Sequence, residues 1–486
     1  MNEDIKTLMP SRLWHYFGEI LLIPRPSKKE EKIAAYLVEF GEKHGLETMR
    51  DAIGNVIIRK PATAGKENIK SVVMQSHIDM VCEKNSDKDH DFDNDPIEAY
   101  IEDGWVTAKG TTLGADDGIG VALSLAILEA DNIEHGPIEC LFTIDEETGL
   151  TGAFGLDAEI LKSRTLLNLD SEDDGLIFIG CAGGKDTLAE MPYKKENIPA
   201  GHLSYKVSVT GLKGGHSGDD IEKGLGNANK ILNRALWNAA NDYGLLLSDF
   251  DAGNLRNAIA REGFAIVMIP EGQAKAFEAY ISTYNKTIKA EYHATDPGVE
   301  VACVKTDTPA FIVDKETQDK LLKGIYACPH GVIAMSQDIE DFVETSTNLA
   351  SVKFKDDVIE FTTSQRSSVE SAKDDVCAMV ASALQLAGFS TRHTDGYPGW
   401  TPNPKSAIVD ITAKVYEDLF KEKPAVQAVH AGLECGLIGD KYPDMDMVSY
   451  GPTIRGAHSP DEKIEIKAVE RFWEMTLEIL RRIPNE

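Results

Sequence analysis

Clusters of acidic and histidine side chains come directly after apolar, strand-like segments, and this feature constrains the fold more than any other. Three clusters follow such a segment: S-H-I-D (76–79), D-E-E-T-G (145–149) and D-S-E-D-D (170–174). Two more lie in loops that contain glycine: T-T-L-G-A-D-D-G (111–118) and R-G-A-H-S-P-D (455–461). Ligand sites of α/β proteins form at the carboxyl ends of strands. The pattern therefore predicts an α/β fold that gathers these side chains at one edge of a sheet.

The order of the expected elements indicates two domains, one inserted into the other. Helices and strands alternate near the N-terminus, which is typical of an α/β layer structure. The expected helix at 28–44 follows Ser27 and Glu30, which resemble a capping box. Between 187 and 392 the pattern changes to strand, helix and strand, repeated in what we interpret as two similar halves. We therefore expect a discontinuous α/β domain, residues 1–186 and 393–486, and an inserted α+β domain, residues 187–392.

Charge and cysteine content exclude several functional classes. The chain of 486 residues carries a formal net charge of −30, and such a surface repels phosphate, so we expect neither nucleic-acid nor membrane partners. The N-terminus lacks a basic region followed by an apolar stretch, so we expect no signal peptide. The seven cysteines are scattered and never spaced C-x-x-C, which indicates reduced thiols and a cytoplasmic location.

Each cluster taken alone has a structural and a functional interpretation. In a strand, His77 and Asp79 point to the same side, so Asp79 can orient a metal-binding imidazole, or His77 can be a structural histidine. Asp116 and Asp117 open an expected helix, where N-capping is the competing explanation. The consecutive carboxylates 145–147 are costly unless a cation neutralises them.

Taken together, the clusters favour a metal site. They combine histidines with carboxylates and contain no cysteine, a set that suits zinc, manganese or cobalt. A carboxylate shared by two ions about 3.5–4 Å apart is the arrangement of two-metal hydrolases.

Six motifs in this order resemble the co-catalytic di-zinc exopeptidases, a family that includes glutamate carboxypeptidase and carnosinase. The motifs are S-H-I-D-M (76–80), G-T-T-L-G-A-D-D-G-I-G (110–120), D-E-E-T-G (145–149), L-D-S-E (169–172), G-G-H-S-G (214–218) and G-A-H-S-P-D-E (456–462). The likeness covers essentially the whole chain and is greatest to the bacterial dipeptidases that cleave Xaa-His. It implies an α/β, zinc-exopeptidase-like catalytic domain, with a mixed sheet flanked by helices, and a large inserted α+β lid domain. It also implies a metal-dependent dipeptidase that hydrolyses unblocked dipeptides with a bridging hydroxide between two zinc ions per chain.

The resemblance assigns roles residue by residue. It implies that the metal ligands are His77, Asp116, Glu147, Asp170 and His458, with Asp116 shared by both ions. Glu146 resembles the general base, Asp79 the partner of His77, and His216 the lid histidine that polarises the scissile carbonyl. Arg366 resembles the arginine that binds the substrate carboxylate, and Asn257 and Gly432 resemble elements of the substrate cleft.

The resemblance leaves several alternatives open. A related N-acyl-amino-acid deacylase or carboxypeptidase is the nearest enzymatic alternative, and a non-catalytic metal-binding scaffold is another. His216 is expected to act within its own chain, because it and Arg366 lie on different halves of one lid. Supply of this histidine by the partner of a homodimer is the other arrangement.

Overall fold

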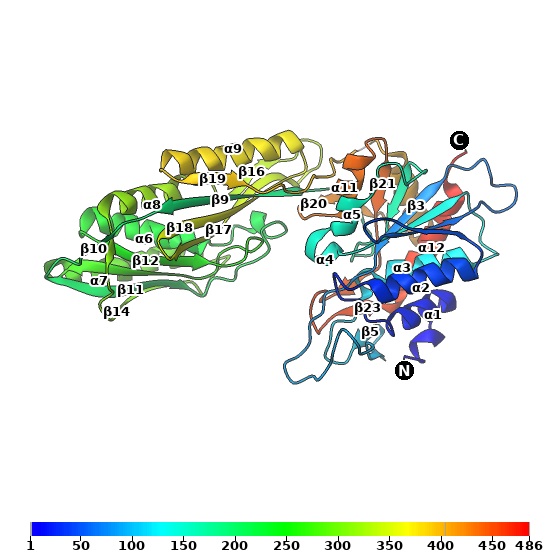
Figure 1. Ribbon diagram of the computed structural model, residues 1–486, viewed down its shortest axis with the longest axis horizontal. Helices are drawn as coiled ribbons and strands as arrows, with labels where there is room; N and C mark the ends of the chain where they lie inside the picture. The colour runs from blue at the N-terminus through cyan, green and yellow to red at the C-terminus, as the bar shows by residue number, and fades with distance from the viewer. Residues whose placement is uncertain (1, 404, 486) are drawn as a thin grey trace. The chain divides into compact units, whose positions relative to one another are not determined.

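The computed structural model describes residues 2–403 and 405–485 and divides the chain into two compact units (Figure 1). Unit 1 comprises Met1–Gly180, Pro402–Ala428 and Leu433–Glu486, and unit 2 comprises Cys181–Thr401 and Val429–Gly432. The sequence placed residues 181–186, 393–401 and 429–432 in the first domain, whereas the structure packs them with unit 2. Backbone hydrogen bonds explain the difference, because Trp400 N donates to Cys181 O and Ala182 N donates to Val429 O.

Unit 1 is built on a mixed eight-stranded sheet with the order β1-β2-β6-β3-β7-β21-β8-β20. The strands are β1 (Glu47–Arg50), β2 (Val56–Lys60), β3 (Val72–His77), β6 (Ile138–Thr143), β7 (Thr165–Asn168), β8 (Leu176–Cys181), β20 (Ala425–Val429) and β21 (Asp446–Ser449). The central strands β6, β3, β7 and β21 are parallel, so their carboxyl ends lie at one edge. Every residue of β3 and β6 is buried, as expected for parallel strands covered on both faces.

The helices of unit 1 are α1 (Ser11–Ile20), α2 (Glu31–Lys43), α3 (Ala115–Glu129), α4 (Glu146–Gly149), α5 (Thr151–Gly155), α10 (Ala407–Phe420), α11 (Glu434–Lys441) and α12 (Ile466–Arg482). Helix α3 packs against β3 and α1, and it is buried almost all round because nearly all its side chains after Asp117 are apolar. Helix α12 carries one apolar face and packs against α10. This sheet flanked by helices confirms the α/β class predicted from the sequence.

A small four-stranded sheet in unit 1 holds one of the loops that carry the sequence clusters. Its order is β22-β23-β5-β4, with β4 (Ala99–Glu102), β5 (Trp105–Ala108), β22 (Ile454–Arg455) and β23 (Lys463–Glu465). The antiparallel pair β22 and β23 encloses the loop that carries His458. The loop therefore begins and ends on paired strands.

Unit 2 is an α+β structure, as the sequence predicted for the inserted region. Its main sheet follows the order β14-β11-β13-β12-β17-β18-β9-β19, and β16 pairs with β17. The strands are β9 (Gly183–Pro192), β11 (His202–Thr210), β12 (Leu246–Gly253), β13 (Gly263–Pro270), β14 (Glu300–Lys305), β16 (Gly331–Met335), β17 (Val343–Lys355), β18 (Val358–Ser367) and β19 (Ser390–His393). A further pair is formed by β10 (Lys195–Glu196) and β15 (Ile312–Val313).

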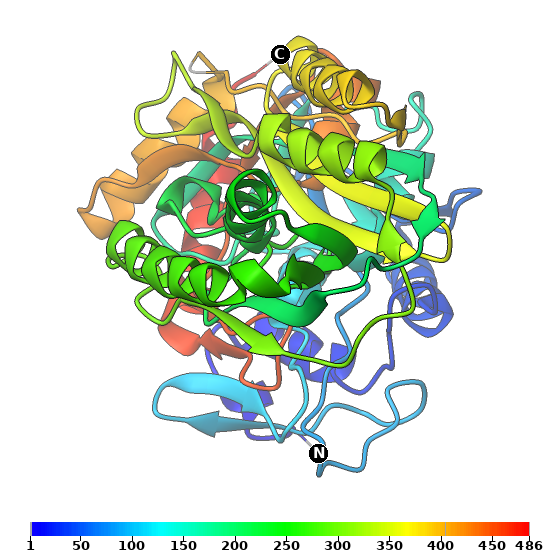
Figure 2. The same cartoon turned by 90° about the vertical axis from the view of Figure 1, so that its left-hand side faces the viewer.

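Four helices cover one face of this sheet and share its hydrophobic core (Figures 1 and 2). They are α6 (Ala228–Asp242), α7 (Ala274–Glu291), α8 (Lys315–Ala327) and α9 (Glu370–Leu386). Phe277 of α7 and Tyr205 of β11 pack edge to face in this core, with ring centroids 5.3 Å apart. One half of the sheet, β14 to β12, contacts α6 and α7, and the other half contacts α9.

Some local predictions were wrong, and each has a physical reason. Ser27 does not cap the second helix, because its hydroxyl donates to Asp79 Oδ2 at 2.8 Å, and α2 begins at Glu31 without a side-chain cap. The sequence pattern of the inserted region also predicted a helix over 221–240, but α6 begins at Ala228, where Asn227 caps it by accepting from the backbone N–H groups of residues 229 and 230.

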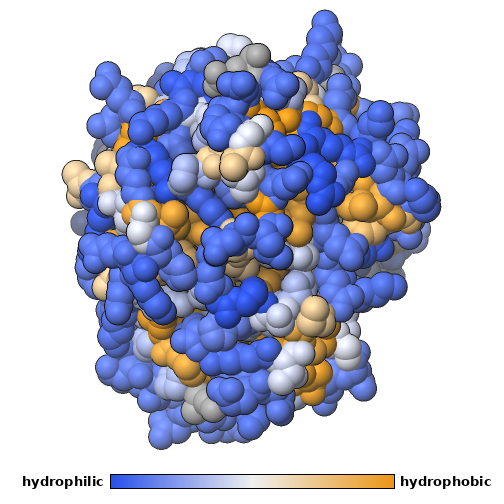
Figure 3. Space-filling view, turned by 90° about the vertical axis from the view of Figure 1, so that its right-hand side faces the viewer, coloured by the Kyte–Doolittle hydropathy of each residue, from blue (hydrophilic) through white to orange (hydrophobic). Residues whose placement is uncertain are grey.

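Hydrophilic side chains dominate the visible surface of unit 1 (Figure 3). The face of unit 1 in Figure 3 is mostly hydrophilic, and its hydrophobic residues form separate patches. Among the described residues, no helix has the length and apolar character needed to cross a membrane.

We predict that Phe277→Ala lowers the free energy of unfolding by about 3–5 kcal/mol, because it removes a fully buried ring and leaves a cavity. Leu386→Ala is the control, since Leu386 is 91% exposed and its removal should change stability by no more than about 0.5 kcal/mol. Urea unfolding followed by circular dichroism measures both. Equal stability of the two variants would contradict the core assignment.

Candidate metal centre

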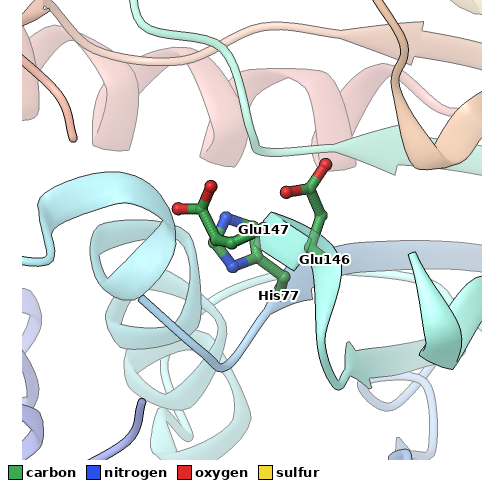
Figure 4. Close-up of side chains that lie close together, drawn as sticks. All are labelled: His77, Glu146 and Glu147. Atoms are coloured by element: carbon green, nitrogen blue, oxygen red, sulfur yellow. The ribbon is translucent and has the colours of Figure 1, made fainter. Parts of the chain in front are cut away.

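Three adjacent parallel strands of unit 1 deliver the first part of the site. His77 is the last residue of β3 and pairs in register with Thr143 at the end of β6. The carboxylates Glu146 and Glu147 follow β6, and Asp170 follows β7 on the other side of β3. Figure 4 shows the carboxylates of Glu146 and Glu147 directed to the same side as the imidazole of His77. The strand order therefore brings together clusters that lie about 70 and 90 residues apart in the sequence.

Asp116, at the start of α3, lies between two histidines. Its Oδ1 is 3.0 Å from His77 Nε2, and its Oδ2 is 3.1 Å from His458 Nε2. His77 Nε2 is also 3.3 Å from Asp170 Oδ1, and His458 Nε2 is 3.1 Å from Glu147 Oε2. The five residues thus form two groups that share one carboxylate, each group with donor atoms close enough to hold one ion.

The crowding of buried carboxylates in this cluster favours the binding of cations. Burial raises the pKa of Asp170 to about 7, and burial among other acids raises the pKa of Glu146 well above its usual range. Hydrogen bonds to Asp116 and Glu147 raise the pKa of His458. Buried Glu147 Oε1 has no hydrogen-bond partner among the described residues. Crowded carboxylates of this kind are stable when cations neutralise them, and nitrogen and oxygen donors without sulfur suit zinc, cobalt or manganese.

Asp79 orients both His77 and the backbone of the glutamate pair. Its Oδ1 lies 3.3 Å from His77 Nδ1 and accepts from Glu146 N at 3.0 Å. Its Oδ2 accepts from Ser27 Oγ and from Glu147 N at 3.3 Å. A carboxylate close to the second ring nitrogen helps to orient the imidazole, and His77 Nε2 faces Asp116 and Asp170.

Glu462 supports Asp116, and the sequence interpretation missed this role. Its side chain is 2% exposed and accepts from the backbone N–H groups of Leu113, Gly114 and Ala115 at 2.7–2.9 Å. Because Glu462 follows His458 in the same loop, one carboxylate ties together the two loops that carry Asp116 and His458. The only signal in the sequence was its position at the end of the G-A-H-S-P-D-E motif.

Glu434 fixes the strand ends beneath the site, a structural role that the sequence did not predict. Its Oε2 accepts from Gln75 Nε2 at 2.7 Å and from Thr143 Oγ1 at 2.6 Å. Gln75 Oε1 in turn accepts from Asn168 Nδ2 at 2.6 Å, so the network spans β6, β3 and β7. Burial raises the pKa of Glu434 to about 8.

The predicted residues of unit 2 form a second, separate group. His216 Nε2 is 3.4 Å from Arg366 Nη2, although the two residues lie on different halves of the inserted region. Asn257 is exposed, and its carbonyl accepts from Ser217 N beside His216. Gly432 packs against the ring of Tyr397.

Comparisons with known proteins find relatives over nearly the whole chain. The sequence pattern of peptidase family M20/M25/M40 matches residues 73–482. The cytosol non-specific dipeptidase of Escherichia coli K12 is 44% identical over 483 residues, 99% of each chain. The crystal structure of aminoacylhistidine dipeptidase from Vibrio alginolyticus has a TM-score of 0.91 and 45% identity, over 99% of this chain and 98% of that one. An aminopeptidase from Bacillus cereus, 17% identical with a TM-score of 0.57 over 98% and 99% of the two chains, shares the fold alone.

We predict that Glu462→Gln weakens metal binding about 10- to 100-fold, because its amide NH2 replaces one of the two carboxylate oxygens that accept the backbone N–H groups shaping the Asp116 loop. Glu465→Gln, on the neighbouring strand β23, is the matched control and should bind metal as the wild type does. Competition with a chelating dye measures the affinity. Wild-type affinity in Glu462→Gln, with an unchanged circular-dichroism spectrum, would contradict the role.

Proposed function

This chain belongs to peptidase family M20/M25/M40, and from that premise we propose that it is a metal-dependent dipeptidase that hydrolyses unblocked dipeptides, Xaa-His among them. The observation that carries the proposal is the position of Asp116, whose two carboxylate oxygens each face a different histidine. The names of the two relatives that match over nearly the whole chain support the choice of dipeptides.

Two zinc ions fit the residues present. His77 and Asp170 would hold one ion, Glu147 and His458 the other, and Asp116 would be shared by both. Zinc is the choice because imidazole and carboxylate ligands suit it, and cobalt or manganese can substitute. When bound, such a pair of ions makes water acidic near neutral pH and offsets negative charge that develops on the peptide carbonyl.

Glu146 moves the proton in the proposed reaction. Its carboxylate follows β6 beside Glu147 and would accept a proton from the attacking water. The protonated Glu146 then donates to the nitrogen of the leaving amine. Asp79 accepts a hydrogen bond from Glu146 N and so fixes the backbone position from which the Glu146 side chain extends.

The residues of unit 2 are proposed to bind the substrate. His216 would donate a hydrogen bond to the scissile carbonyl and stabilise the oxyanion. Arg366 would bind the C-terminal carboxylate, and Asn257 and Gly432 would line the cleft around the peptide. Because His216 and Arg366 of one chain already lie side by side, no partner subunit is needed to pair them.

We also propose a cytoplasmic location. The Escherichia coli relative is named for the cytosol, and Cys82, Cys140, Cys303, Cys328 and Cys377 carry free thiols. Free thiols are typical of reducing compartments.

Hydrolysis of L-alanyl-L-histidine by the zinc-loaded protein, compared with N-acetyl-L-alanine, tests the proposed substrate class. We expect turnover of the dipeptide and none of the acylated amino acid. Preferential hydrolysis of N-acetyl-L-alanine would indicate a deacylase, and hydrolysis of neither would overturn the proposal.

We predict that Glu146→Gln lowers kcat for L-alanyl-L-histidine by at least about 100-fold, because the amide cannot accept the proton from water. The metal content should stay at the wild-type value, since Glu146 is not assigned as a ligand. Elemental analysis and steady-state kinetics check the two expectations together. A metal-loaded Glu146→Gln variant with near-wild-type kcat would reject the assigned base.

A further inference from the structure

Arg366 is a buried cation that lacks a counter-ion. The residue is 6% exposed, and its N–H groups reach Ser217 Oγ at 3.3 Å, Tyr397 Oη at 3.1 Å and His216 Nε2 at 3.4 Å. Across residues 2–403 and 405–485, no carboxylate lies within ion-pair distance of its guanidinium. A buried charge is stable when it is paired, so this position favours an anion.

The groups around Arg366 limit the charge of that anion. His430, whose Nε2 is 2.7 Å from Ser346 Oγ, is neutral, because burial and the nearby Arg366 lower its pKa to about 3. Asp219 is exposed and directed to His216 Nδ1 at 3.1 Å. One guanidinium therefore supplies the positive charge, which matches a single carboxylate better than a doubly charged phosphate.

Tyr397 is held rigidly beside this guanidinium. Its backbone N–H donates to Gly184 O at 2.8 Å, and its carbonyl accepts from Gly184 N at 3.1 Å and from Lys373 Nζ at 2.6 Å. The backbone of Tyr397 is thus fixed to β9 and α9 of the same unit.

The ring of Tyr397 lies in a slot between two glycines. A Cβ atom at Gly184 would come within 2.7 Å of Cε1, Cζ and Oη, and one at Gly432 would lie 2.8 Å from Cε2. Real Cβ atoms do not approach other atoms so closely, so both positions require the absence of a side chain. This explains Gly432 physically: it makes room for the tyrosine that faces Arg366.

The hydroxyl of Tyr397 is available to donate a hydrogen bond. Because a guanidinium can only donate, Arg366 Nη1 occupies a lone pair of Oη and leaves the phenol O–H to donate elsewhere. No acceptor for that proton exists among the described residues. We propose that Tyr397 is a substrate-binding residue that acts with Arg366 to select peptides with a free C-terminal carboxylate. This inference rests on the proposed dipeptidase function.

The test compares L-alanyl-L-histidine with its C-terminal amide, using the ratio of the two kcat/KM values. In Tyr397→Phe we expect kcat/KM for the dipeptide to fall by about 10-fold or more, mainly through KM, because a hydrogen bond to a charged group is lost. The value for the amide should change by no more than about two-fold, since the amide lacks the carboxylate that the hydroxyl recognises. A residue with a merely structural role would lower both values together.

Two further variants keep the test decisive. Tyr193→Phe is the matched control, because the Tyr193 hydroxyl in the same unit donates to Asp356 O, and its ratio should equal that of the wild type. Gly432→Ala displaces the Tyr397 ring without removing the hydroxyl, and it should also lower the ratio. If Tyr397→Phe folds poorly, the ratio measured for Gly432→Ala tests the role of the Tyr397 hydroxyl instead.

The possible failures are distinguishable. A wild-type ratio in Tyr397→Phe, together with a lost preference in Arg366→Ala, would overturn the role of Tyr397 and leave the proposed dipeptidase intact. Equal rates of the wild type on dipeptide and amide would overturn recognition of the carboxylate by both residues. Absence of dipeptide hydrolysis in the wild type would overturn the proposed function itself.

Discussion

The crowding of carboxylates around two histidines is the constraint on which the rest of unit 1 depends. Asp116 faces His77 with one oxygen and His458 with the other, and Asp170 and Glu147 complete the two groups. Like charges at such distances disfavour one another, and the raised pKa of Asp170 reflects this cost together with burial. Bound cations would offset this repulsion, because each carboxylate would then be attracted to a positive ion.

A shell of buried polar side chains holds these residues in place. Asp79 fixes His77, Glu462 fixes the loop of Asp116, and Glu434 joins the strand ends beneath them. Buried Arg25 donates from Nη1 to the carbonyls of Ile78 and Asp79 and from Nη2 to that of Gly114, so it ties the end of β3 to the Asp116 loop. Ligands set in advance reorganise less on binding, which is the physical use of such a shell.

The sequence predicted the fold class and the meeting of the acidic and histidine clusters at one sheet edge, because both depend on local patterns. Continuous apolar runs mark β3 and β6, and polar clusters at their ends mark a sheet edge. Glu462 and Tyr397 escaped prediction because their partners, three backbone N–H groups and a guanidinium, lie far away in the sequence. Ser27 was misassigned for a related reason, since a distant carboxylate, Asp79, competes for its hydroxyl.

The central claim is that one carboxylate, Asp116, joins two metal sites. The most direct measurement is anomalous X-ray diffraction at the zinc absorption edge from crystals of the zinc-loaded protein. The account predicts two anomalous peaks per chain on either side of Asp116, one beside His77 and Asp170, the other beside Glu147 and His458. A single peak, or peaks away from Asp116, would contradict it.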